Sequence, residues 1–384
     1  MGRLTILIAL LATAANAADW SALDRHQQTI SRPEFDRLLA TVFCPSGAFT
    51  NYLAYATNSV TVCSTPEKTN ALFTLRFAPA SAPAPTLAPV RSIALDPGHI
   101  GGAWARMEER YFVRGNGRPV QEAALNLTMA RLLKPRLETN GFTVAFTKEN
   151  FEPVTKKRPE DFRLIAQDYA AQLHRLDGFP PLERQAAIAD AASRYQERMF
   201  YRVAEIGARA QRINRDIRPD LTLCIHFNAV DWNDRYDLVE ANHLVIFVGG
   251  NYLPEELADD EQKFGLMSKL LERSHKTELA AAEAVADALA RATKLPPVEY
   301  GNGSGAFRVG TNRYVYARNL AANRWFNGPV VYLEPYYMNN RITYQRIQLG
   351  DYDGEREIEG KRYRSIFREY ADAVAEGLLK FVPR

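Results

Sequence analysis

A short apolar run that ends in Asp-Pro-Gly-His constrains the fold of this chain more than any other stretch. The run at 93–95 reads Ile-Ala-Leu, which is long enough for a buried strand and too short for a helix. The Asp-Pro-Gly at 96–98 ends the strand, because proline lacks a backbone donor and glycine adopts angles that other residues avoid. His99 therefore follows the carboxyl end of a strand, where open α/β sheets place their ligand sites. A lone histidine in such a turn usually has no function, so its meaning depends on the polar residues that join it.

The residues after this loop predict a parallel arrangement. Leucines recur at helical spacing between residues 120 and 137, Asn140-Gly141 ends that helix, and residues 142–147 alternate like a strand. A strand, a helix and a second strand in this order are typical of a parallel βαβ unit. Further apolar strands are expected at 221–226, 243–248 and 330–333, and further helices at 203–217, 278–292 and 366–381. We therefore expect an α/β fold with a mostly parallel mixed sheet flanked by helices, a helical insertion and a small N-terminal segment.

The first residues have the pattern of a secretory signal. Arg3 precedes an apolar run at 4–12 that is too short to span a bilayer, and Ala15-Asn16-Ala17 offers small residues for cleavage. We expect a signal peptide at 1–17, with a buried first helix as the alternative. No later segment is long and apolar enough to span a membrane. The mature protein is thus predicted to be soluble and periplasmic or secreted, without a transmembrane segment.

Composition divides the rest of the chain at a Pro/Ala-rich stretch. Residues 78–89 are expected to form a stiff linker. The sequence assigns no role to the N-terminal region at 18–77, and it predicts the main domain at 90–384. Residues 151–199 are charged and helix-prone, and the segment is much longer than a simple connection between a helix and a strand, which needs roughly 2–6 residues. They are therefore interpreted as a helical insertion.

The chain has three cysteines, two of which are close in sequence. In an oxidising compartment Cys44 and Cys63 could close a loop within the N-terminal region through a disulfide. Two free thiols are the alternative, since sequence alone does not fix the pairing. Cys224 lies in an apolar strand and is expected to be a small buried residue.

Four polar residues at the ends of predicted elements form the candidate site. His99, His226 and Glu334 each follow or end an apolar strand, and Glu122 opens a helix. Each has a simpler interpretation, such as a core histidine, a helix-dipole charge or an ordinary strand-end carboxylate. Together, two imidazoles and one carboxylate make a zinc-ligand set that leaves a fourth position for water. Zinc lowers the pKa of a bound water molecule to about 7. A second carboxylate could then take a proton from that water and give it to a leaving amine.

From Val90 to its end, the chain resembles the zinc-dependent N-acetylmuramoyl-L-alanine amidases of the cell-wall hydrolase type. The opening motif of that family, Asp-Pro-Gly-His-Gly-Gly, is matched by Asp-Pro-Gly-His-Ile-Gly-Gly at 96–102. A Glu just before a Leu-rich helix is matched by Glu122, and Ser-Ile-His-x-Asn is matched by Cys-Ile-His-Phe-Asn at 224–228. The Leu-Glu that ends a late strand is matched by Leu333-Glu334.

The resemblance implies a zinc amidase domain at 90–384. Its reaction would be hydrolysis of the amide bond between N-acetylmuramic acid and L-alanine in peptidoglycan, with one Zn²⁺ ion as cofactor. Residues near the ligands would hydrogen-bond to them or contact the substrate. The residues implied are the metal ligands His99, Glu122 and His226, the general base Glu334, and, near the ligands or the substrate, Asp96 and Asn228.

The chain departs from the family pattern beside these motifs. Ile100 stands where the family has Gly, which makes the loop of the first motif less compliant. Cys224 replaces a Ser, Lys148 replaces an Arg, and Pro335 alters the turn that follows the late strand. None of these changes removes an implied ligand or the base, so they bear on substrate shape more than on the chemistry.

The insertion at 151–199 suggests control of access to the site. In some members of the resembled family a helical insertion covers the site until a partner displaces it, so an activating protein could act on this segment. An acidic residue such as Glu160 or Asp161 could then serve as a plug. The alternative is an additional wall of the substrate groove.

Two other function classes stay open beside the amidase. One is a zinc-dependent peptidase that acts on related cell-wall peptides, and the other is a non-catalytic cell-wall-binding relative. The intact set of four polar residues argues against the second class. With 48 basic and 45 acidic residues, the net charge of +3 does not point to nucleic acid. The partner that the family resemblance implies is peptidoglycan.

Overall fold

The computed structural model describes residues 18–81, 89–173, 178, 180–230, 237–301 and 304–381. The predicted signal peptide at 1–17 and most of the predicted linker lie outside the described residues. Among the described residues, no helix combines the length and the apolar composition needed to cross a bilayer.

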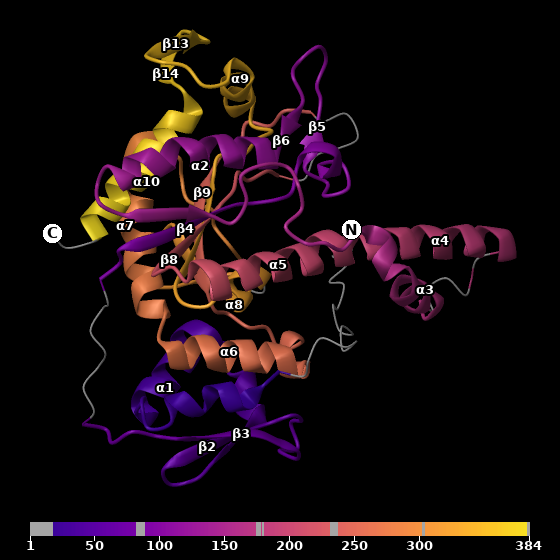
Figure 1. The fold of residues 1–384 in the computed structure, drawn as a ribbon, viewed down its shortest axis with the longest axis vertical. Coiled ribbons are helices and arrows are strands. Elements are labelled where there is room, and N and C mark those ends of the chain that lie inside the picture. Colours follow the sequence, from indigo (N-terminus) through magenta and orange to yellow (C-terminus); the bar gives the residue numbers. More distant parts are fainter. Residues whose placement is uncertain are drawn as a thin grey trace.

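A seven-stranded mixed sheet forms the centre of the molecule (Figure 1). Its strand order is β10-β11-β9-β12-β8-β4-β7. The strands β7, β4, β8 and β12, which are neighbours in this order, run parallel to one another. Strand β9 runs antiparallel to β12, and β11 runs parallel to β9. The expected mostly parallel mixed sheet is thus confirmed, while the sequence reasoning missed β10 and β11. The strand bounds are β4 Ser92–Pro97, β7 Thr143–Phe146, β8 Leu221–Ile225, β9 Leu244–Gly249, β10 Phe307–Arg308, β11 Val315–Arg318 and β12 Val330–Pro335.

Helices cover both faces of this sheet (Figure 1). On one face, apolar side chains of three long helices bury together with the inward residues of the strands. These helices are α2 Glu122–Glu138, α7 His275–Thr293 and α10 Ile366–Phe381. The other face is packed by α5 Glu205–Gln211, the π-turn η8 Arg212–Ile217 and α8 Ala321–Trp325. Apolar residues at helical spacing, such as those of α10, explain why these segments form helices and which side they bury.

The N-terminal region packs into a second hydrophobic core, which it shares with residues of the main domain. Its strands β1 to β3 form an antiparallel meander, and its apolar residues bury against α6 (Asp260–Glu272), which lies between this region and the rest of the molecule (Figure 1). The elements are η1 Trp20–His26, α1 Arg32–Leu38, η2 Leu39–Phe43, η3 Ala48–Tyr52, β1 Leu53–Tyr55, β2 Ser59–Cys63 and β3 Ala71–Arg76.

The disulfide considered between Cys44 and Cys63 is absent, because both cysteines are buried free thiols. The sulfur of Cys44 lies 3.3 Å from the hydroxyl of Ser46 and accepts the backbone N–H of Phe49. The sulfur of Cys63 faces the carbonyl oxygen of Thr61 instead. Each thiol therefore has its own local contacts.

The insertion is helical, as expected, and its hairpin extends away from the sheet (Figure 1). It contains η5 Pro159–Phe162, α3 Arg163–Ala171 and α4 Pro181–Arg198, and it continues into η7 Met199–Ala204. Tyr169 and Tyr195 stack at 4.0 Å and join the two helices of the hairpin. At its base, Phe200 and Tyr201 bury against Ile100 of the first motif loop. The bulky residue that departs from the family pattern therefore anchors the insertion.

The remaining elements are short and lie between those already described. They are η4 Gly102–Trp104, β5 Tyr111–Phe112, β6 Val120–Gln121, η9 Glu256–Ala258, α9 Arg341–Leu349, β13 Glu355–Ile358 and β14 Lys361–Arg364.

The close contact between α10 and α7 predicts opposite effects at two helical glycines. A Cβ atom on Gly377 would lie 2.5 Å from the Cα atom of Val285, so Gly377→Ala should lower the free energy of unfolding by about 1–3 kcal/mol through overpacking. A Cβ atom on Gly207 in α5 would meet nothing within 4 Å. The matched control Gly207→Ala should raise stability by about 0.5–1 kcal/mol through helix propensity. Urea unfolding of both variants measures this, and equal stability of the two would contradict the packing described.

Candidate metal centre

Three of the predicted site residues come together at one edge of the sheet. His99 follows β4, His226 follows the neighbouring parallel strand β8, and Glu122 is the first residue of α2. One ligand atom from each lies within 4.8 Å of the others. Because carboxyl ends of parallel strands meet at the same edge, two loops distant in sequence are brought side by side.

The Glu122 carboxylate lies between the two imidazoles. Its Oε2 atom is 3.2 Å from Nε2 of His99, and its Oε1 atom is 2.8 Å from Nδ1 of His226. The two rings are 5.1 Å apart and nearly perpendicular. The guanidinium of Arg110, which the sequence reasoning missed, lies with its Nε atom 3.0 Å from Oε2 of Glu122.

Burial and mutual charge set the protonation of this group. Burial alone raises the pKa of Glu122, but the His99 charge and hydrogen bonds from both histidines hold that pKa well below its usual range. Burial lowers the pKa of His99, but Glu122 and Glu108 raise it to about 9. Burial lowers the pKa of His226 below its ordinary value. At neutral pH the metal-free protein therefore holds an ionised Glu122 beside a charged His99, and a bound cation would take the place of the His99 proton.

Buried charged side chains fix the backbone of the loop that carries His99. Arg209 donates through Nη1 to the carbonyl oxygen of Pro97 at 3.0 Å and through Nη2 to that of His99 at 2.8 Å. Lys148 donates to the carbonyl oxygen of Ile100 at 3.1 Å. His99 itself has φ +64°, a left-handed conformation that is uncommon for residues other than glycine. The loop therefore keeps a costly conformation because its polar groups are held from several sides.

Asp96 supports this loop from the buried side. Its Oδ1 atom lies 3.2 Å from Nη1 of Arg209 and accepts the hydroxyl of Thr147. Asn228 is placed differently. Its side-chain oxygen accepts the N–H of Ala229 at 2.7 Å, so its described contacts lie in the strand-end turn rather than at the three ligand atoms.

Glu334 lies in β12, next to β8, with its charge close to the histidine–carboxylate group. Burial and the charge of Glu122 raise the pKa of Glu334 to about 7, against the opposing effect of two arginines and His99. Tyr332, on the same face of the strand, stacks on the His226 ring at 4.3 Å. A half-ionised carboxylate near neutral pH thus accompanies the three ligand atoms, and such a group can accept or give a proton.

Glu160 and Asp161 of the insertion have no contact with the three ligand residues among the contacts described for them. Asp161 accepts the backbone N–H of Arg158 at 2.8 Å and so caps its own short turn. Glu160 is exposed and has no described contact with His99, Glu122 or His226. The expectation that either residue serves as a plug is therefore not supported within the part of the chain that the structure describes.

The donor set fits a zinc ion. Two imidazole nitrogens and one carboxylate oxygen converge, which matches the three protein ligands of catalytic zinc sites. A set of two nitrogens and one carboxylate oxygen suits Zn²⁺, whereas Mg²⁺ and Ca²⁺ prefer sets made only of oxygen ligands.

The sequence analysis did not identify Glu108 and Arg110, because neither residue lies at a predicted strand end or in a motif.

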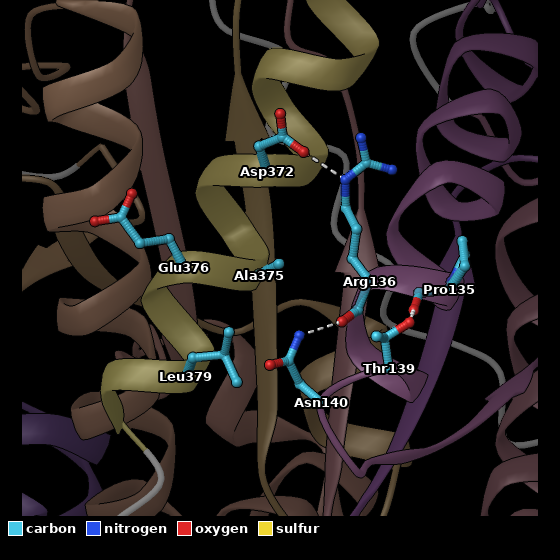
Figure 2. Close-up of a pocket in the computed structure, with 8 residues that line it drawn as sticks. All are labelled: Pro135, Arg136, Thr139, Asn140, Asp372, Ala375, Glu376 and Leu379. Atoms are coloured by element: carbon cyan, nitrogen blue, oxygen red, sulfur yellow. Dashed lines mark hydrogen bonds and ion pairs between the residues drawn. The ribbon is translucent and has the colours of Figure 1, made fainter.

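A surface hollow of about 580 Å³ lies elsewhere, between α2 and α10 (Figure 2). An ion pair between Arg136 and Asp372 borders it, and Asn140 donates to the carbonyl oxygen of Arg136. Arg136 follows Glu122 by fourteen residues in the same helix, which is about 21 Å along the axis. This hollow is therefore separate from the candidate metal centre.

The raised pKa of Glu334 predicts a pH-dependent stability in the metal-free protein. In the unfolded chain this carboxyl ionises near 4.5, so between about pH 4.5 and 7 the folded state binds more protons and stability falls as the pH rises. Glu334→Gln removes this loss and should raise the free energy of unfolding by about 1–2 kcal/mol at pH 8, with little effect at pH 4.

Urea unfolding in the presence of a chelator measures this difference. The exposed Glu152→Gln serves as the charge-matched control and should change stability little at either pH. An effect of Glu334→Gln that is the same at pH 4 and pH 8 would exclude the proposed shift.

Comparisons with known proteins address the same region. The family model described as N-acetylmuramoyl-L-alanine amidase matches residues 93–366, which include all four residues of the predicted site. A search of curated proteins found no match.

Several solved structures are similar at low sequence identity. The apo N-acetylmuramyl-L-alanine amidase Ami1 from Mycobacterium abscessus is 16% identical, covers 76% of this chain and 99% of its own, and has a TM-score of 0.40. The amidase AmiC2 of Nostoc punctiforme is 17% identical, with coverages of 76% and 97% and a TM-score of 0.39. The CwlD amidase from Clostridioides difficile, solved in complex with the GerS lipoprotein, is 14% identical, with coverages of 76% and 98% and a TM-score of 0.40.

Proposed function

The chain belongs to the N-acetylmuramoyl-L-alanine amidase family, and from this premise we propose that it hydrolyses the amide bond between N-acetylmuramic acid and L-alanine in peptidoglycan. The observation that carries the proposal is the convergence of His99, Glu122 and His226 within 4.8 Å, inside the region that the family model matches. Glu334 in the neighbouring strand β12, whose charge interacts with those of Glu122 and His99, is the second carboxylate that this reaction needs.

We assign the metal to the two histidines and the carboxylate between them. His99 would bind through Nε2, His226 through Nδ1 and Glu122 through its carboxylate, since these atoms face one another. A zinc ion bound there would lower the pKa of a water molecule and polarise the scissile carbonyl. The stack of Tyr332 on His226 and the hydrogen bond of Arg209 to the carbonyl oxygen of His99 restrict the two histidines, which supports this assignment.

In this proposal Glu334 moves the proton. Its carboxylate takes a proton from the attacking water as the oxygen adds to the carbonyl carbon, and it then gives that proton to the amide nitrogen as the C–N bond breaks. The products are a carboxylic acid on the muramoyl side and a free amino group on L-alanine. The balance of atoms requires only one water molecule for each bond cleaved.

Purified full-length protein should release stem peptides whose first residue is L-alanine with a free amino group. Mass spectrometry of digested peptidoglycan checks this outcome. Cleavage between residues within the stem peptide would favour the zinc-peptidase alternative, and binding to peptidoglycan without any cleavage would favour the non-catalytic one.

Glu334→Gln and His99→Ala should separate catalysis from metal binding. Glu334→Gln should retain zinc and lose turnover by about 10²- to 10⁴-fold, because it removes only the proton acceptor. His99→Ala should lose both zinc and turnover, because it removes one of three ligands. Zinc content by elemental analysis, beside muropeptide release, gives the two readouts, and Glu152→Gln is the control. Turnover at the wild-type rate in Glu334→Gln would contradict the assigned base.

We further propose that the protein acts outside the cytoplasm, because its substrate lies there and its first seventeen residues have the pattern of a secretory signal. The insertion is the proposed contact site for an activating protein. Two apolar side chains on its hairpin, Leu164 and Leu182, are 76% and 81% exposed, which is unusual for large apolar residues unless a partner covers them.

Replacement of residues 163–198 by a short Gly-Ser linker tests the role of the insertion. If the hairpin restricts access, peptidoglycan hydrolysis by the shortened protein should rise several-fold over that of the full chain. A decrease would instead identify the hairpin as a wall of the substrate groove. An unchanged rate would contradict a gating role.

A further inference from the structure

We propose that Glu108 is a positioning residue of the metal centre, which orients His99 from behind and keeps its Nε2 atom available for the ion. This inference rests on the proposed function, because it concerns the same site. Neither the motifs nor the spacing of predicted elements singles out Glu108.

The Glu108 carboxylate is buried, and it accepts hydrogen bonds from two neighbouring backbone N–H groups of the loop that carries His99. Its Oε1 atom accepts the N–H of Ile100 at 2.8 Å, and its Oε2 atom accepts the N–H of Gly101 at 2.9 Å. The same Oε1 atom lies 3.5 Å from Nδ1 of His99. Only 3% of the residue is exposed, so these groups replace the water that an ionised carboxylate would otherwise need.

The two nitrogens of His99 consequently have different neighbours. Nδ1 faces Glu108, while Nε2 faces Glu122 at the centre of the ligand group. When the proton of a neutral imidazole is on Nδ1, directed at a carboxylate, the lone pair of Nε2 is available for a metal ion. Glu108 thereby selects both the tautomer and the orientation of the ring.

The segment that carries Glu108 is folded so that this carboxylate points back at the loop. After η4, the N–H of Glu108 donates to the carbonyl oxygen of Trp104 at 3.0 Å, and the N–H of Arg110 donates to that of Ala105 at 3.0 Å. The Trp104 ring packs on Phe200 at the base of the insertion, 4.9 Å between centroids. A local turn and a tertiary contact together thus set the position of Glu108.

His226 is oriented by a different device, which makes the effect of Glu108 specific to one ligand. The His226 ring stacks on Tyr332 at an interplanar angle of 17°. Loss of the Glu108 charge should therefore disturb His99 and leave the second histidine in place.

The experiment compares zinc affinity in the full-length wild type, Glu108→Gln, Glu108→Asp and Glu109→Gln. Glu109 is the adjacent, exposed carboxylate, so its variant is the charge-matched control. Chelator competition should give a zinc Kd about 10- to 100-fold weaker for Glu108→Gln, in the range measured for lost outer partners of metal-bound histidines. Glu108→Asp keeps the charge and should fall between Glu108→Gln and the wild type, whereas Glu109→Gln should bind like the wild type.

A second readout distinguishes positioning from general support of the fold. The visible spectrum of the Co²⁺-loaded protein reports the geometry of the ligands, and it should change in Glu108→Gln but not in Glu109→Gln. An unchanged spectrum together with unchanged zinc affinity, even in a less stable protein, would overturn the inference.

The outcomes also separate this inference from the proposed function. A wild-type protein that binds no zinc would contradict the metal site itself, and with it both proposals. A wild type that binds zinc and releases muropeptides, beside a Glu108→Gln variant of equal zinc affinity, would overturn the role of Glu108 alone.

Discussion

The buried carboxylate of Glu122 is the constraint on which the rest of the site depends. An ionised carboxylate away from water is costly unless partners compensate its charge. Here the partners are His99 and His226, one on each oxygen, with Arg110 as a third. Since these groups belong to separate loops and a helix start, they meet only if β4 and β8 are neighbours and α2 begins at the same edge of the sheet. The electrostatics of one side chain and the topology of the sheet are therefore linked.

Charges of alternating sign continue outward from this centre. Behind His99 lies Glu108, and Arg209 beside the same loop pairs with Glu205 at 2.8 Å. Glu205 in turn accepts the N–H of Thr155, at the start of the insertion, at 3.1 Å. The loop that carries His99 and the base of the insertion are thus parts of one buried polar network. In such a network each charge is stabilised by the next, and removal of one leaves its neighbour unpaired.

The sequence predicted the elements whose signals are local. Strands β4 and β8 are short apolar runs with clear ends, and α10 has apolar residues at helical spacing. The type of each element could therefore be predicted, and its ends could be placed within one or two residues. Strand β11 (Val315–Arg318) was missed although β7 is as short, because β7 directly follows a predicted helix and its Asn140-Gly141 end, whereas no predicted element leads into β11. For Cys44 and Cys63 the sequence left a disulfide and two free thiols open, because proximity in sequence does not fix the direction of a side chain. The structure has the free thiols.

The sequence by itself determined the chemistry that the candidate site can offer: two strand-end histidines, a carboxylate that opens a helix and a second carboxylate in a later strand. Only the tertiary structure decided which of their atoms face one another, and that Glu108 and Arg110 join them. The physical reason is that a ligand group is defined within a few ångströms by contacts between residues far apart in the chain. A motif fixes the type and order of residues, whereas their separation in space depends on how the sheet, its loops and the helices pack.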